Sequence, residues 1–202
     1  MRWLAQQFGT VRSLDVLIAA SRNVGIRTRL AKLRHQAFVE MVEVLRTPRV
    51  RTLLLDLVQW LALGAWLHDP RKAPRLDKFA AAQLDRRLRR LMRKGEGFPE
   101  LDDRHRHRVR IEAKKLRYAT EFLASIYGGE KAAKRRKMWL DTLETLLEAL
   151  GDLNDEAVAA ETLASFGIDR NAVTFDHEAQ EALRRAAELG FATLSDLKRY
   201  WR

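Results

Sequence analysis

Apolar residues recur every three or four positions along most of this 202-residue chain, a spacing that is typical of amphipathic helices. Alternating apolar and polar runs of strand length are essentially missing. Alanine, leucine, arginine and glutamate, which all favour helix, are abundant. We therefore expect an all-α fold, with helices over residues 2–8, 13–22, 26–46, 48–67, 77–94, 103–127, 131–150, 153–165, 175–188 and 194–200.

The clearest break in the helical pattern is the segment 68–74. It contains Pro70 and Pro74, and proline does not fit the interior of a helix. We interpret this segment as a linker. The sequence therefore predicts a first helical part over residues 1–70 and a second over residues 71–202.

A short internal repeat indicates that the two parts are related. Residues 3–19 and residues 146–160 both place a glycine after an apolar helix end and a valine seven positions later. We expect each glycine to end one helix and a following polar residue to help start the next. These residues are Gly9 and Gly151 for the ends, and Ser13 and Asp155 for the starts.

The formal charge of the chain is +11, and it is unevenly distributed. Residues 141–190 carry twelve acids and three bases, so the rest of the chain is strongly basic. Such a balance indicates a polyanionic partner: nucleic acid, an acidic membrane surface or a phosphate polymer. The acids either form a solvated face or position the basic residues by ion pairing.

Several classes of protein are excluded by what the sequence lacks. There is no cysteine, hence no disulfide framework and no cysteine nucleophile. No apolar run approaches the ~20 residues of a membrane span, and no signal-peptide core precedes the first helix. Motifs for phosphate loops, dinucleotides, zinc proteases and serine hydrolases are absent. We expect a cytoplasmic protein without catalytic residues, metal site or cofactor.

Two successive helices concentrate the basic residues. On the first, Arg86, Arg89, Arg90 and Arg93 fall within an arc of about 100°, opposite several leucines. On the second, one stripe collects basic and polar side chains, opposite a row that includes Val109 and Leu116. The members of this stripe are His107, Arg110, Lys114, Arg117, Tyr118 and Glu121, with Lys115 beside them.

Like charges three or four residues apart repel, at a cost of a few tenths of a kcal/mol per pair. Arginine offers a planar fork of donors that matches phosphate oxygens, and lysine adds a mobile point charge. The stripe is thus interpreted as a phosphate-binding surface, although an ordinary solvated face has the same spacing. We expect the five tryptophans to pack in the core rather than stack on bases: Trp3, Trp60, Trp66, Trp139 and Trp201.

Residues 107–122, HRVRIEAKKLRYATEF, resemble the signature helix of the CHAD family, the histidine-containing α-helical domain. Leu150 to Asp155 resembles the L-G-x-L-N-D turn of that family, and Gly9 to Val16 resembles its counterpart in the first half. Thr47-Pro48-Arg49 before a leucine-rich helix and the terminal Tyr200-Trp201 also fit. The resemblance covers nearly the whole chain.

This resemblance implies two four-helix repeats around a basic central channel, which together form one CHAD domain. It implies non-enzymatic binding of inorganic polyphosphate in the cytoplasm, in association with polyphosphate granules. The implied binding residues are His107, Arg110, Lys114, Lys115, Arg117 and Tyr118, together with Arg86, Arg90, Arg34 and Arg49, which are assigned by helix placement.

The chain departs from the family pattern at its start. The first repeat normally opens with its own basic helix, whereas this sequence starts after it, and Ser13 stands where aspartate is usual. We expect an incomplete first repeat, with the missing helix either lost or supplied by a second copy or a partner chain. The alternative function is generic binding of nucleic acid or another polyanion. A metal-dependent phosphohydrolase finds no support in the spacing of the acids.

Overall fold

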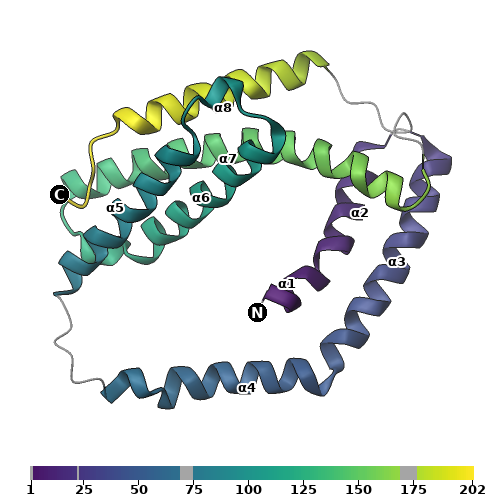
Figure 1. The fold of residues 1–202 in the computed structure, drawn as a ribbon, viewed down its shortest axis with the longest axis horizontal. Coiled ribbons are helices and arrows are strands. Elements are labelled where there is room, and N and C mark those ends of the chain that lie inside the picture. The colour runs from purple at the N-terminus through teal and green to yellow at the C-terminus, as the bar shows by residue number, and fades with distance from the viewer. Residues whose placement is uncertain (1, 22, 69–74, 169–176) are drawn as a thin grey trace. The chain divides into compact units, whose positions relative to one another are not determined.

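The computed structural model describes residues 2–21, 23–68, 75–168 and 177–202, and over these residues the protein contains α- and 3-10 helices and no strand (Figure 1). The expectation of an all-α fold is confirmed. The α-helices are α1 (Arg2–Gln7), α2 (Gly9–Ala20), α3 (Val24–Arg46), α4 (Pro48–Leu63), α5 (Leu76–Lys94), α6 (Asp103–Phe122), α7 (Glu130–Ser165) and α8 (His177–Asp196). Short 3-10 helices are η1 (Ala65–His68), η2 (Phe98–Glu100) and η3 (Ala124–Ile126).

The chain divides into two compact units. The first comprises Met1–Lys72 and Val158–Thr174, and the second comprises Ala73–Ala157 and Phe175–Arg202. Long α7 contributes to both. The predicted halves, residues 1–70 and 71–202, and their arrangement as two repeats around a basic channel stay predictions.

The first unit has a small core. Leu14 and Leu17 of α2 and Leu30 of α3 are fully buried, and α2 packs along α3. Helix α3 begins where Asn23 accepts a hydrogen bond from the backbone N–H of Ile26 at 3.1 Å, an N-cap that satisfies one end group of the helix. Helix α4 begins at a proline in its first turn, where the missing N–H costs nothing.

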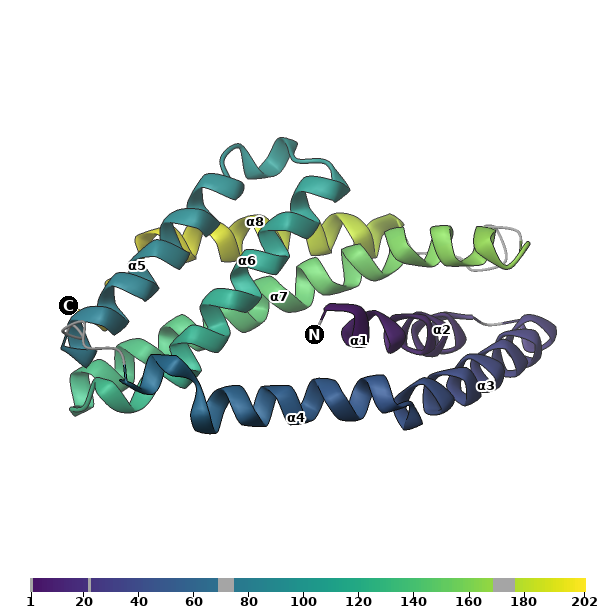
Figure 2. The same ribbon diagram turned by 60° about the horizontal axis from the view of Figure 1, so that its bottom comes forward.

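The second unit holds the larger core, which is built on α5, α6, α7 and α8. Helices α5 and α6 lie side by side (Figures 1 and 2). Their leucine faces meet in this core, as the sequence pattern predicts. The buried residues on these two helices are Ala80, Leu84, Leu88, Leu91, Val109, Ala113, Leu116 and Thr120.

The C-terminal residues after α8 pack into the same core. Trp201 and Tyr200 are buried, and their ring centroids lie 4.8 Å apart. The Trp139 ring lies 5.0 Å from Trp201, and its Nε1 donates to the carbonyl of Lys198 at 3.0 Å. The expected helix over residues 194–200 is therefore wrong beyond Asp196, because aromatic packing holds these residues in a different conformation.

Two expected helix breaks are wrong. Helix α7 continues through Gly151, and Asp155 lies inside it rather than starting a helix. A glycine inside a helix costs about 1 kcal/mol relative to alanine. Burial of the neighbours Leu150 and Leu153 outweighs this cost, because burying one leucine contributes about 1.5–3 kcal/mol.

Helix α8 likewise continues past residue 188, where the sequence predicts a helix end, and it includes Gly190. A Cβ at Gly190 would lie 3.3 Å from the Cβ of Leu146, so this glycine permits the close approach of α7 and α8 instead of ending a helix. At the N-terminus the break comes one residue earlier than expected, since Gly9 opens α2 and Ser13 lies within it. Ser13 is therefore not the residue that starts this helix.

The tryptophans differ in burial. Trp139 and Trp201 are buried as expected, and Trp3 is half-buried. Trp60 on α4 is 58% exposed, so the expectation of core packing is wrong there. The side chain of Trp66 lies outside the described part of the structure.

Candidate anion-binding surface

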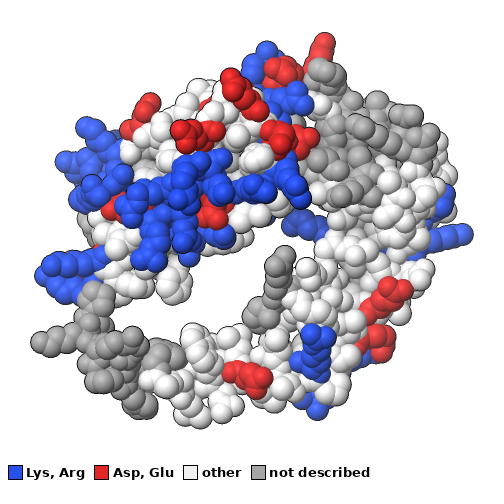
Figure 3. Space-filling view, in the orientation of Figure 1, with Lys and Arg blue, Asp and Glu red and all other residues white. Residues whose placement is uncertain are grey.

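The second unit carries eight of the ten candidate binding residues, on two adjacent helices. Arg86 and Arg90 lie on α5, and the other six, from His107 to Tyr118, lie on α6. Lys and Arg side chains gather over these helices on the face shown in Figure 3. The remaining two candidates, Arg34 and Arg49, belong to the first unit.

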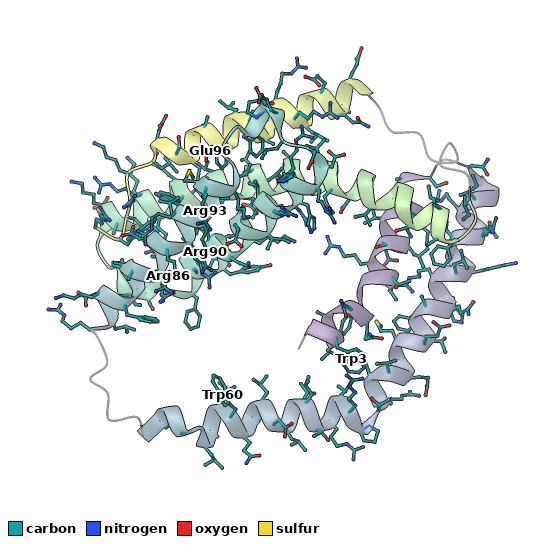
Figure 4. The ribbon with its side chains drawn as sticks, in the orientation of Figure 1. Trp3, Trp60, Arg86, Arg90, Arg93 and Glu96 are labelled. Atoms are coloured by element: carbon teal, nitrogen blue, oxygen red, sulfur yellow. The ribbon has the colours of Figure 1, made fainter. Side chains whose placement is uncertain are left out.

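The exposed side of α5 carries a row of four arginines, which we call the α5 row: Arg86, Arg89, Arg90 and Arg93. Three of them follow one another along the helix in Figure 4. Within the described residues, none of the four forms a hydrogen bond or an ion pair. Their donors are therefore directed at solvent and available to an anion. Arg89 and Arg93 are not among the ten binding residues expected from the sequence, although the helical wheel places them in the same arc.

Asp85, which precedes this row in the sequence, is held by side chains near the C-terminus. Asp85 accepts from Arg199 at 3.0 Å, from Trp201 Nε1 at 2.9 Å and from Arg202 at 2.7 Å. Residues four apart on a helix can pair, so Asp85 is the natural partner of Arg89. The C-terminal side chains bind both carboxylate oxygens, and Arg89 forms no ion pair among the described residues.

Burial opposes ionisation of Asp85, but the hydrogen bonds from Arg202 and Trp201 and the charges of Arg199 and Arg202 outweigh it. Together they hold the pKa of Asp85 below its usual value of 3.8. This carboxylate is therefore ionised at neutral pH.

Two cations on α6, Lys115 and Arg117, are less available than the arginines of the α5 row. Lys115 donates to Glu112 at 2.6 Å, and Arg117 donates to Glu121 at 3.0 Å. Both pairs lie within the helix and are partly exposed, so each contributes little to stability. They do reduce the net charge that this part of α6 presents to an anion. Tyr118 is exposed beside them.

The first half of the α6 stripe lies against α7. The Nδ1 atom of His107 is hydrogen-bonded to the Oδ1 atom of Asn154. A Cβ at Gly151 would lie 3.5 Å from Nη2 of Arg110, so the arginine side chain passes close to the α7 backbone. The Nε of Arg110 is buried without a hydrogen-bond partner in the described structure, and Lys114 is half-buried nearby in sequence.

Helix α6 begins at a polar cap. The side chain of Asp102 accepts from the backbone N–H of His105 at 2.8 Å. This hydrogen bond, followed by a second from the His105 ring, lowers the pKa of Asp102 below its usual value. The cap satisfies an end group of the helix and fixes where α6 starts.

Both first-unit candidates have partners in their own unit. Nε of Arg34 donates to Asp15 at 2.9 Å, and the Arg34 guanidinium lies 5.3 Å from the Phe38 ring centroid. The Arg49 guanidinium lies 3.9 Å from the centroid of Trp3, a cation–π contact. The two arginines are therefore engaged locally, in contrast to those of the α5 row.

In the described part of the chain, no group of three or more histidine, aspartate or glutamate side chains is arranged to hold a metal ion. No helix among the described residues is both long enough and apolar enough to cross a membrane.

A family model for the CHAD domain matches residues 1–164. The chain belongs to the CHAD family. The resemblance that rests on the α6 signature is thereby confirmed. The match identifies a CHAD domain and no catalytic domain. Comparison with curated proteins and with solved structures found no match.

CHAD domains are known for binding polyphosphate. In this CHAD domain, the signature helix α6 packs against its neighbour α5. Sequence reasoning missed the C-terminal contacts to Asp85, because they join residues 114 to 117 positions apart. The predicted pattern residues Tyr200 and Trp201 lie beyond the matched range.

Proposed function

We propose that this CHAD domain binds inorganic polyphosphate without turning it over, through the α5 row and the α6 stripe. The observation that carries the proposal is the α5 row, four exposed arginines without an ion-pair partner in the described structure. Such guanidinium groups suit phosphate oxygens, which they bind with two parallel hydrogen bonds.

The chemistry of polyphosphate fits a row of this kind. The polymer repeats one anionic group along a flexible backbone and carries no bases. A helix repeats its side chains about every 5.4 Å along its axis, so successive arginines of α5 offer donors at regular intervals. Binding would release counterions and weaken steeply as salt is added. Association with polyphosphate granules would follow from the same affinity.

The α5 row is tested by the double substitution Arg86→Ala with Arg90→Ala. Hydrogen bonds to charged groups contribute about 1.5–3 kcal/mol each, so we expect affinity for long-chain polyphosphate to fall at least about tenfold. The slope of log K against log salt should become shallower by about 2. Fluorescence titration at two salt concentrations measures both quantities.

The matched control removes two charges elsewhere in the same unit. Lys131 and Lys134 are exposed at the start of α7, and their replacement by alanine should change affinity less than threefold. An equal loss in both double variants would show that net charge alone, rather than the α5 row, determines binding.

The α6 stripe is tested by Arg110→Ala with Lys114→Ala, which we expect to remove most binding while circular dichroism shows unchanged helicity. Unchanged affinity in that variant would remove the stripe from the site. Equal affinity for duplex DNA would favour the alternative of a generic polyanion binder.

A further inference from the structure

A pocket of about 810 Å³ opens between α5 and α6, at the end of the arginine-bearing surface. Its lining includes Phe79, Gln83, Arg87, Lys115, Tyr118 and Phe122, together with Glu121, whose carboxylate accepts from Arg117 at 3.0 Å. All belong to the second unit. Its volume falls in the range of pockets that hold small organic ligands, about 300–1,000 Å³.

Three aromatic side chains stand around the opening. Phe122 is 85% exposed, Tyr118 is 60% exposed and Phe79 is 44% exposed. Single exposed apolar residues are common on protein surfaces, whereas a cluster around one pocket indicates a binding site. Exposed aromatic rings favour flat ligands, because stacking adds to the burial of apolar area.

Polar groups accompany the rings. The Arg87 guanidinium has no ion-pair partner among the described residues, whereas Lys115 is paired with Glu112. Gln83 presents an amide, which can both donate and accept hydrogen bonds. A ligand that fits these groups has a planar, hydrogen-bonding ring and a negatively charged end.

The position of Arg87 connects the pocket to the α5 row. Arg87 is adjacent to Arg86 and three residues from Arg90, so the three guanidiniums share one side of α5. A chain of phosphates that begins at the pocket can therefore continue along the row without leaving the helix.

We propose that this pocket is a base-binding subsite for nucleoside polyphosphates. The base would stack against Phe79, Tyr118 and Phe122, and the phosphates would extend over Arg87 onto the α5 row. The inference rests on the proposed function for its phosphate part alone, because the base contacts are separate side chains.

The experiment compares ATP with inorganic tripolyphosphate, using isothermal titration calorimetry on the full chain. Tripolyphosphate carries at least as much negative charge and has no base, so tighter binding of ATP cannot come from charge. We expect ATP to bind at least fivefold more tightly, as the lower range of base stacking predicts. Equal affinity of the wild-type protein for the two ligands would overturn the proposal.

Phe122→Ala should remove the preference for ATP and leave the affinities for tripolyphosphate and long-chain polyphosphate unchanged. Phe122→Leu keeps an apolar side chain and removes the aromatic ring, so a lost preference in this variant identifies stacking. Leu189→Ala, at an exposed position on α8, is the matched control. A preference for ATP that survives Phe122→Ala contradicts the assignment of the pocket.

The two proposals fail in different ways. If long-chain polyphosphate binds and ATP has no advantage over tripolyphosphate, the base subsite is wrong and the proposed function stands. If ATP binds in a Phe122-dependent manner and long-chain polyphosphate does not bind, the proposed function is wrong and the subsite stands. Absence of binding by all three ligands overturns both.

Discussion

At the scale of single residues, Asp85 determines how α5 meets the C-terminus. Its carboxylate is bound by Arg199, Trp201 and Arg202, and these contacts lower its pKa. The free energy of unfolding therefore includes a contribution that requires Asp85 to be ionised. Since the unfolded chain takes up a proton at a higher pH than the folded one, this contribution is complete above about pH 4 and is lost as pH falls.

We predict that Asp85→Asn lowers the free energy of unfolding at pH 7, and that the difference from wild type shrinks as pH falls below about 4. Urea unfolding followed by circular dichroism at several pH values measures this difference. Other carboxylates affect wild type and variant equally, so they cancel in the comparison. A difference that stays constant down to pH 2.5 would be inconsistent with the role of the Asp85 charge.

The same contacts keep Asp85 away from the α5 row. In Arg199→Ala with Arg202→Ala, Trp201 still donates to Oδ1 of Asp85, but Oδ2 loses its partner and can pair with Arg89. An exposed pair of this kind is worth about 0.3–0.5 kcal/mol, so we expect polyphosphate affinity to fall about twofold. Adding Asp85→Asn should restore part of this loss. If the third substitution changes nothing, the C-terminus acts through its own charge and not through Asp85.

At the scale of elements, α4 and α6 differ in how far their leucines are buried. Leu116 of α6 is fully buried, whereas Leu55 of α4 is 61% exposed. Leucine-to-alanine substitution in a core costs about 2–5 kcal/mol, and at an exposed site it typically costs less than about 0.5 kcal/mol. The ratio of these two effects thus reports whether α4 is covered in solution.

We predict that Leu116→Ala lowers the free energy of unfolding by at least about 2 kcal/mol and that Leu55→Ala changes it by less than about 0.5 kcal/mol. Urea titration at two protein concentrations measures both. A large effect of Leu55→Ala that grows with protein concentration would favour a second copy of the chain over this face. A large effect independent of concentration would contradict the exposure of Leu55.

The helices also show which features of the fold can be predicted from the sequence. The faces of α5 and α6 are predictable because periodicity places Leu88 and Leu116 opposite the basic residues, and burial follows from that pattern. The continuity of α7 is not predictable from the sequence, because tertiary packing outweighs the tendency of Gly151 to end a helix. The partners of Asp85 and the exposure of Trp60 depend on contacts between distant segments, which no local pattern encodes.

At the scale of the whole molecule, the charge of +11 does not cancel at the candidate surface. Among the described residues, two acids of the stretch 141–190 form ion pairs with basic residues three or four positions away on the same helix. Asp141 pairs with Lys137 at 2.6 Å, and Glu181 pairs with Arg184 at 3.6 Å. Neither pair includes an arginine of the α5 row, so these contacts leave the positive charge of the row in place.

This distribution leads to a prediction about selectivity. Long-chain polyphosphate is flexible and can follow one row of arginines. Duplex DNA is stiff, with a persistence length of about 150 base pairs, and its bases are already stacked, so it gains nothing from the exposed rings. We expect at least a tenfold excess of duplex DNA charge to be needed to displace labelled polyphosphate, at both about 50 and about 200 mM salt. Over this range, binding through phosphate contacts weakens by orders of magnitude.

The salt dependence separates the two functions that the family and the charge permit. A preference that persists at the higher salt concentration indicates hydrogen bonding to positioned guanidinium groups, because long-range attraction between exposed charges is largely screened there. A preference that vanishes there, together with equal competition by DNA, would mean that α5 and α6 form only a generic polyanion surface. Arg86→Ala with Arg90→Ala should then weaken both ligands equally, whereas a polyphosphate site predicts a larger loss for polyphosphate.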